Sequence, residues 1–110
     1  MIPPTGSYPT FAPEKCLALP GVEMVCIGEG EEVLRSLCRA LDAGADHTGI
    51  AGLWIKDATG IRRNPLAPPV NMDDNPLPDL SLFDDSRLYR PMQGRVWRML
   101  PVETHRGCPY

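Results

Sequence analysis

The residues with the clearest chemical potential stand late in the chain, where Cys108 follows Arg106 and Gly107 and precedes Pro109. A thiolate is a good ligand for iron, and cysteine ligands of iron–sulfur clusters come in closely spaced sets. The apolar run 96–102 just before this turn favours a strand, so the turn would hold Cys108 at the strand's carboxyl end. A single cysteine does not define a cluster, so an exposed thiol without a role is the alternative.

A second candidate site is a glycine-rich turn between an expected strand and an expected helix. Its residues are Gly28, Glu29, Gly30 and Glu31. Open α/β sheets bind ligands at the carboxyl ends of their strands, and a helix N-terminus offers free amides to phosphate or amide oxygens. Glycines permit close backbone approach to such a ligand. The alternative is a turn that needs two glycines and binds nothing, with the glutamates capping the helix.

A further Gly/Pro turn, residues 6–10, stands upstream of the expected strand and is predicted to be a loop. The two histidines, His47 and His105, lack a nearby carboxylate or thiol at ligand spacing, so we expect both to be surface residues or locally hydrogen-bonded. The acidic residues between 73 and 85 lack the ordered spacing of a calcium loop. None of these features predicts a metal site.

The elements that would position these residues are of α/β type. Residues 22–27 form a mostly apolar run between glycines, which predicts a buried parallel strand. A helix should follow, with Glu31 and Glu32 at its N-terminus, apolar residues at helical spacing and Gly44 as its stop. Residues 50–61 contain a glycine turn between two apolar runs and predict a hairpin.

Proline sets the organisation of the second half. The chain has 13 prolines in 110 residues, against an average of about 5%, and residues 64–86 read as an extended, acidic linker. One strand, one helix and a hairpin cannot close a parallel sheet. We therefore expect a fragment: the end of an α/β domain over 1–63, a linker over 64–95, and the opening of another domain over 96–110.

Composition and charge narrow the partners and the location that we expect for the protein. The formal charge is −3, with acidic and basic residues mixed along the chain, so nucleic acid is not an expected partner. No apolar run reaches the roughly 18 residues of a membrane span, and no signal peptide is recognisable, which makes a cytoplasmic setting the default. Cys16, Cys26 and Cys38 are predicted to be buried free thiols, with a metal or redox role as the alternative, and Trp54 and Trp97 are predicted to serve packing.

Taken in order, these motifs resemble radical SAM enzymes that carry an N-terminal cobalamin-binding-type domain. The resemblance spans nearly the whole chain. The matching residues are Gly6 with Pro9, Thr10, Pro13 and Glu14; residues 28–31; Gly52, Leu53 and Lys56 with Gly60; Asn64; Leu77, Pro78 and Asp79; and Thr104 with residues 106–110.

The resemblance implies an S-adenosylmethionine-cleaving enzyme with a small-molecule substrate and a 4Fe–4S cluster. Cys108 would be the first of three cluster cysteines, the other two falling two and five residues after Tyr110. The fold implied is a Rossmann-like domain end followed by the first strand of a partial (β/α) barrel, over residues 99–103. Arg106 and Gly107 would shape the cluster loop, and the piece by itself should be inactive.

The resemblance also makes cobalamin a possible cofactor. Gly6, Ser7 and residues 28–31 would lie where related domains receive its nucleotide tail. Tyr8 stands where histidine is common in the family, and His105 where serine is usual. The alternative, which does not depend on the family resemblance, is a non-catalytic α/β module that binds a small ligand or a partner.

Overall fold

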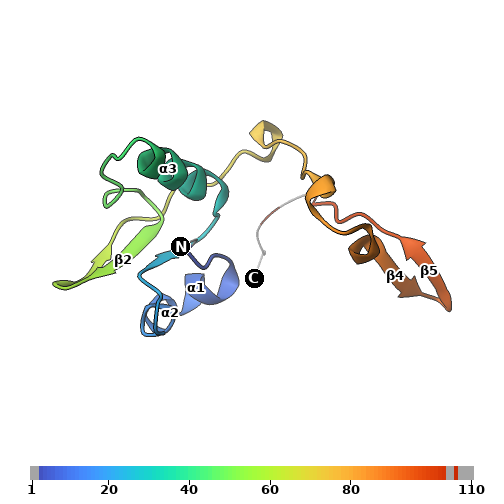
Figure 1. Cartoon of the computed structure of the whole chain (residues 1–110), viewed down its shortest axis with the longest axis horizontal. Helices are drawn as coiled ribbons and strands as arrows, with labels where there is room; N and C mark the ends of the chain where they lie inside the picture. The colour runs from blue at the N-terminus through green and yellow to red at the C-terminus, as the bar shows by residue number, and fades with distance from the viewer. Residues whose placement is uncertain (1–2, 104–105, 107–110) are drawn as a thin grey trace. The chain divides into compact units, whose positions relative to one another are not determined.

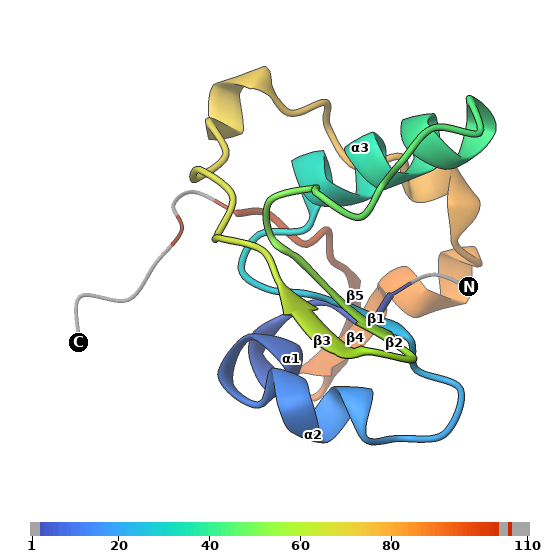
Figure 2. The same cartoon turned by 90° about the vertical axis from the view of Figure 1, so that its left-hand side faces the viewer.

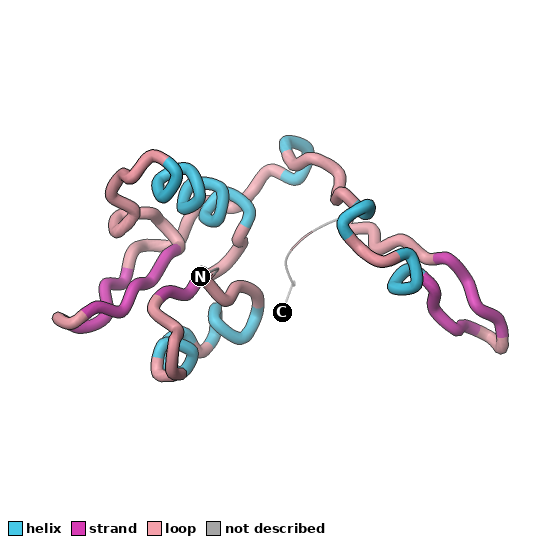
Figure 3. The backbone as a smooth tube through the Cα atoms, viewed as in Figure 1, coloured by secondary structure: helices cyan, strands magenta, loops and turns pink. Residues whose placement is uncertain are grey.

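The computed structural model describes residues 3–103 and 106, and it divides into two compact units, Met1–Val70 and Asn71–Tyr110 (Figure 1). The described chain is a mixed α/β structure with small sheets. Its helices are short, and none of those described is long and apolar enough to cross a membrane. Figure 3 shows the alternation of helix, strand and loop along the backbone.

The first unit is a three-stranded antiparallel sheet covered by helices on both faces. Its strands are β1 (Met24–Cys26), β2 (Leu53–Asp57) and β3 (Gly60–Arg63), in that order. Helix α3 (Glu31–Asp42) covers one face. The short helices α1 (Ser7–Phe11) and α2 (Pro13–Leu17) lie on the other face (Figure 2).

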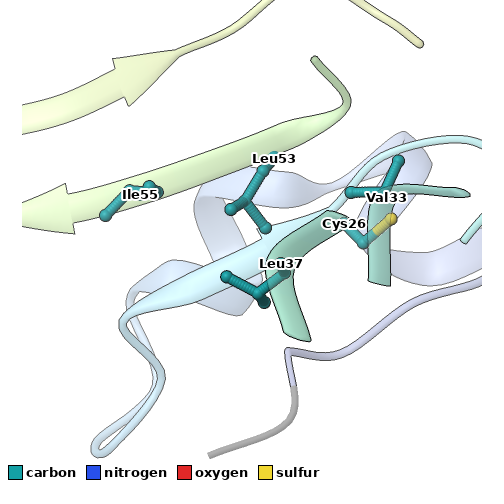
Figure 4. Close-up of a cluster of buried hydrophobic side chains, with 5 residues drawn as sticks. All are labelled: Cys26, Val33, Leu37, Leu53 and Ile55. Carbon is teal, nitrogen blue, oxygen red and sulfur yellow. The ribbon is translucent and has the colours of Figure 1, made fainter. Parts of the chain in front are cut away.

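Alternation along the strands divides the apolar side chains between the two faces, because successive residues of a strand point to opposite sides. On the α3 face, Cys26 of β1 and Leu53 and Ile55 of β2 pack with Val33 and Leu37 of the helix (Figure 4). The opposite face holds a second buried cluster. Its members are Cys16, Leu17, Val25 and Ile27. The sheet is thus buried on both sides although it is antiparallel.

Helix α3 confirms the prediction of a helix directly after the first strand. Glu31 and Glu32 lie in its first turn, where acidic residues favour the positive end of the helix dipole. Val33 and Leu37 are spaced by four residues, so both face the sheet. Just past its end, Gly44 takes a left-handed conformation with φ +59°.

The predicted hairpin is also confirmed, as β2 and β3. The Asp57 carboxylate holds its two-residue turn by accepting hydrogen bonds from the Thr59 amide at 2.7 Å and the Gly60 amide at 3.1 Å. Acceptance of local amides by an aspartate is typical of tight turns. These bonds set the register in which Asp57 opposes Gly60.

Two expectations for this unit are wrong. The strand predicted over 22–27 is not parallel: β1 pairs antiparallel with β2, with Val25 opposite Trp54. A short apolar run has the same pattern in either orientation, and the direction depends on the connection between strands. Residues 6–10 were expected to be a loop, but Ser7–Phe11 form α1, which places Pro9 in the first turn, where proline is tolerated.

The second unit has three 3₁₀ turns and one hairpin. The turns are η1 (Met72–Asp74), η2 (Leu80–Leu82) and η3 (Asp85–Leu88), and the strands are β4 (Tyr89–Met92) and β5 (Arg95–Arg98). Aspartates of the expected linker cap η2 and η3, as when the Asp79 carboxylate accepts from the Ser81 amide at 3.0 Å, and Asn71 caps η1. The linker is therefore locally folded, not uniformly extended.

Three further outcomes concern exposure and the last expected strand. The apolar run over residues 96–102 was predicted to be a strand, but β5 ends at Arg98 and residues 99–103 are not in a strand. Trp97 keeps 46% of its surface exposed. Cys16 and Cys26 are buried free thiols as predicted, whereas Cys38 is exposed because it lies on the outer side of α3.

Candidate functional site

The candidate site of the first unit lies at the carboxyl end of β1, where residues 28–31 lead into α3. Gly28 has φ +79°, a conformation that glycine adopts without strain. Its amide donates a hydrogen bond to the Thr10 hydroxyl oxygen at 3.0 Å. The Thr10 hydroxyl in turn donates to the Gly6 carbonyl at 2.7 Å. The two glycine turns singled out in the sequence thus meet through Thr10.

Gly30 is required by a close approach of another segment. The Cys26 amide donates to the Pro4 carbonyl at 2.9 Å, which places Thr5 beside the turn. A Cβ on Gly30 would lie 2.8 Å from the Thr5 hydroxyl oxygen. Gly30 is also the N-cap of α3 and, having no side chain, makes no side-chain cap of its own. The alternative that a glutamate caps α3 stays a prediction.

The Glu29 side chain turns to a distant segment. Its carboxylate oxygen Oε2 accepts a hydrogen bond from the Val70 amide at 2.5 Å. Its backbone carbonyl accepts a weak contact from the Cys26 thiol at 3.9 Å. Burial raises the pKa of the Cys26 thiol, a hydrogen bond with Thr5 opposes the rise, and the Glu31 carboxylate adds to it. Cys26 is therefore protonated at neutral pH and is a poor nucleophile or metal ligand.

Gly52 shapes the neighbouring edge of the sheet, just before β2. Its carbonyl accepts from the Ile27 amide at 2.8 Å and its amide donates to the Pro65 carbonyl at 2.7 Å. It is buried with φ +79°, and a Cβ would lie 2.8 Å from Val33 Cγ2. Only glycine fits both constraints. Sequence analysis did not predict this role for Gly52, because its partners Ile27 and Pro65 lie far from it along the chain.

Asn64 fixes the chain where β3 ends. Its side-chain amide donates to the carbonyls of Thr48 at 2.9 Å and Leu53 at 2.7 Å. Its backbone carbonyl accepts from the Trp54 indole at 3.1 Å. The Arg63 guanidinium lies 5.3 Å from the centre of the Trp54 ring, a cation–π geometry. Trp54 thus serves packing, as predicted.

The remaining candidates divide between described and undescribed residues. Ser7 is the exposed first residue of α1, and His47 is half-buried between α3 and β2. Cys108 lies outside the described residues, as do His105 and Gly107. Arg106 is described, and its guanidinium pairs with the Glu103 carboxylate at 2.9 Å. Within 3–103 and 106, no three His, Cys, Asp or Glu side chains gather as a metal ion would require.

The described part of the site therefore binds other parts of the chain. The Gly28 amide, the Glu29 carboxylate and both hydrogen-bonding groups of Gly52 have partners within the first unit. Among the described residues, this arrangement shapes the carboxyl end of β1 and the edge beside Gly52.

Comparison with known proteins gives three curated relatives. The chain is 34% identical to an uncharacterized methyltransferase of Pyrococcus horikoshii and 31% identical to the anaerobic magnesium-protoporphyrin IX monomethyl ester cyclase of Rubrivivax gelatinosus, with 96% of the chain covered in each. It is 28% identical, over 93% of its length, to the 4′-phospho-dehydrooxetanocin synthase of Priestia megaterium. No protein-family model and no solved structure matches.

These matches cover only a part of each relative. The chain spans 22% of the methyltransferase, 20% of the cyclase and 13% of the synthase. All three relatives are named as enzymes. Along nearly its whole length, the chain is thus similar to one part of each of three longer enzymes.

Proposed function

We propose that this chain works as part of a radical SAM enzyme, one that reductively cleaves S-adenosylmethionine at a 4Fe–4S cluster. The observation that carries the proposal is the similarity of 93–96% of the chain to three enzymes. The ordered motifs that end in residues 106–110 support it from the sequence side. The names of two relatives, a magnesium-protoporphyrin IX monomethyl ester cyclase and a 4′-phospho-dehydrooxetanocin synthase, favour a small-molecule substrate.

In this proposal Cys108 is one thiolate ligand of the cluster. A cluster held there would supply the electron for the reductive cleavage of S-adenosylmethionine. The described residues carry no metal-binding group, so their part is to hold the chain that leads to Cys108. The Arg106–Glu103 ion pair, at 2.9 Å, stands just before Cys108 in the sequence.

Cobalamin binding stays a prediction. Gly6, Ser7 and residues 28–31 do lie in one region of the first unit, through Thr10. However, the Gly28 amide and the Glu29 carboxylate already bind within the chain, so these two groups do not fit a cofactor contact. Desalting the full-length protein after incubation with hydroxocobalamin tests it, and absence of retained cofactor would remove cobalamin from the reaction.

The cluster is tested by anaerobic reconstitution of the full-length protein with iron and sulfide. We expect the Cys108→Ala variant to lose cluster iron and the cleavage of S-adenosylmethionine to 5′-deoxyadenosine. Cys38→Ala is the matched control, because Cys38 is an exposed thiol on the outer side of α3. Its iron content and activity should equal those of the wild type.

Two results would overturn the proposal. One is a Cys108→Ala protein that keeps the wild-type iron content and cleaves S-adenosylmethionine. The other is a wild-type protein that binds no cluster, which would favour a non-catalytic binding module. The 110-residue chain alone should hold no stable cluster, because one thiolate cannot replace the set that such clusters need.

A further inference from the structure

The last segment of the first unit, residues 64–70, lies along the edge that residues 28–31 and Gly52 form. We refer to it as the strap. Asn64, Ala67 and Val70 are half-buried, whereas the four residues between them are exposed. A burial period of three is typical of a polyproline II helix, and three of the seven strap residues are prolines. One side of the strap thus faces the rest of the first unit along the whole length of the strap.

The inward side of the strap uses the room that two glycines leave. The Pro65 carbonyl accepts from the Gly52 amide at 2.7 Å, and Ala67 packs against the core cluster beneath α3. A Cβ on Gly52 would lie 3.3 Å from the Ala67 Cβ, and one on Gly28 would lie 3.6 Å from Leu66 Cδ2. The strap therefore passes close to both positions: a Cβ would be tight against Ala67 at Gly52 and in ordinary contact with Leu66 at Gly28.

At its end the strap is held by Glu29. The Glu29 carboxylate accepts from the Val70 amide across 41 positions of sequence. A hydrogen bond to a charged acceptor is worth about twice one between neutral groups. Val70 is also the last residue of the first unit, so this bond lies where the chain leaves it.

We propose that residues 28–31 form an internal docking site for the strap, with Glu29 as the positioning residue that fixes the exit of the chain from the first unit. The turn has the sequence of a ligand-binding loop, but its occupant is the chain itself. This inference goes beyond the proposed function and does not depend on it, since it concerns contacts within residues 3–70. When the strap is bound in this way, its seven residues no longer act as flexible linker between the first unit and the second.

Hydrogen exchange of the full-length protein at single-residue resolution tests the docking site. In Glu29→Ala the Val70 amide loses its acceptor, and we expect its exchange to accelerate roughly tenfold or more. Glu29→Gln keeps an acceptor oxygen at the same distance along the side chain, so its exchange should stay within about threefold of wild type.

The matched control is Glu32→Ala, which removes an exposed carboxylate of α3 that pairs with Arg35 at 2.5 Å. It should leave the Val70 amide unchanged. The Lys56 amide, which donates to the Glu23 carbonyl at 2.7 Å inside the sheet, reports on the fold as a whole. The proposal is overturned if Val70 exchanges at the wild-type rate in Glu29→Ala. It is equally overturned if Val70 and Lys56 accelerate together, or if Glu29→Gln behaves like Glu29→Ala.

Discussion

At the scale of single residues, the candidate site depends on glycines whose absent side chains make room for other parts of the chain. Gly52 has a left-handed backbone, and a side chain at this position would meet Val33 and Ala67. A side chain at Gly30 would meet Thr5. These are close approaches between protein segments, not openings toward solvent. A glycine between a strand and a helix is therefore compatible with a ligand-binding loop and with an internal contact. Which of the two it forms depends on the protein segments packed against it.

Replacing Gly52 by alanine should lower the free energy of unfolding of the chain by about 2–5 kcal/mol. A left-handed backbone costs a non-glycine residue about 1–2 kcal/mol, and a Cβ placed 2.8 Å from Val33 Cγ2 adds overpacking of about 1–3 kcal/mol. Gly44→Ala is the matched control, because Gly44 has φ +59° with open space around it. Urea unfolding followed by circular dichroism should show a clearly smaller loss for Gly44→Ala; equal losses would mean that the crowding at Gly52 is relieved at no cost.

The turn between β2 and β3 makes a prediction about pH. Hydrogen bonds from the Thr59 hydroxyl and amide, and a weaker one from the Gly60 amide, lower the pKa of Asp57. The ionised form is thus favoured in the folded state, so this stabilisation is present above the unfolded-state pKa of about 3.9 and is lost as the pH falls through the lower folded-state value.

Thr59→Ala should therefore raise the pKa of Asp57 toward its ordinary value. An NMR titration of the Asp57 carboxyl carbon measures the shift. Ser81→Ala is the control, because Ser81 hydrogen-bonds Asp79 in the second unit and should leave the Asp57 titration unchanged. An Asp57 titration that is the same in Thr59→Ala and wild type would contradict the role of the hydroxyl.

At the scale of elements, local signals in the sequence were sufficient for α3 and for the β2–β3 hairpin. Acidic residues at a helix start, apolar residues at i and i+4, and an Asp-Ala-Thr-Gly turn all act within a few positions. The orientation of β1 was predicted wrongly, because it depends on pairing with β2, which lies 27 or more positions away. Helix α1 was missed, since its N-cap Gly6 makes no side-chain hydrogen bond that the sequence could signal.

In the candidate site, too, local features were predicted correctly and long-range contacts were not. The place of Gly28 and Gly30 between strand and helix was predicted correctly from the pattern alone. Their partners were not, because the Gly28–Thr10 and Glu29–Val70 bonds join positions 18 and 41 residues apart. No periodicity covers such distances, so a sequence pattern can locate a turn without showing what the turn binds.

The packing of α3 on the sheet predicts a difference between two leucines of one helix. Leu37 is buried in the cluster with Leu53 and Ile55, whereas Leu41 is 50% exposed. Leu37→Ala should lower the free energy of unfolding by about 2–5 kcal/mol, since it leaves a cavity between helix and sheet. Leu41→Ala should cost less than about 1 kcal/mol. Denaturant unfolding measures both, and similar losses would show that α3 does not pack on the sheet through Leu37.

At the scale of the whole chain, the two units differ in how much apolar surface they bury. The first unit has a cluster on each face of its sheet, with five and four buried residues. Among the described residues of the second unit, Leu88 alone is buried. A two-stranded hairpin is marginally stable by itself in water. The two units should therefore differ in local stability.

Hydrogen exchange of the 110-residue chain should show this difference directly. Amides of β1 and β2 open only when the first unit unfolds, whereas those of β4 and β5 open when a single hairpin frays, so the hairpin should exchange at least about a hundredfold faster. Arg98→Ala removes the Arg98–Asp85 ion pair, whose atoms lie 3.1 Å apart and exposed, and should change the hairpin rates less than about threefold. Equal protection of β4–β5 and β1–β2 would contradict the prediction, because the hairpin would then need a source of stability beyond Leu88 and its ladder of backbone bonds.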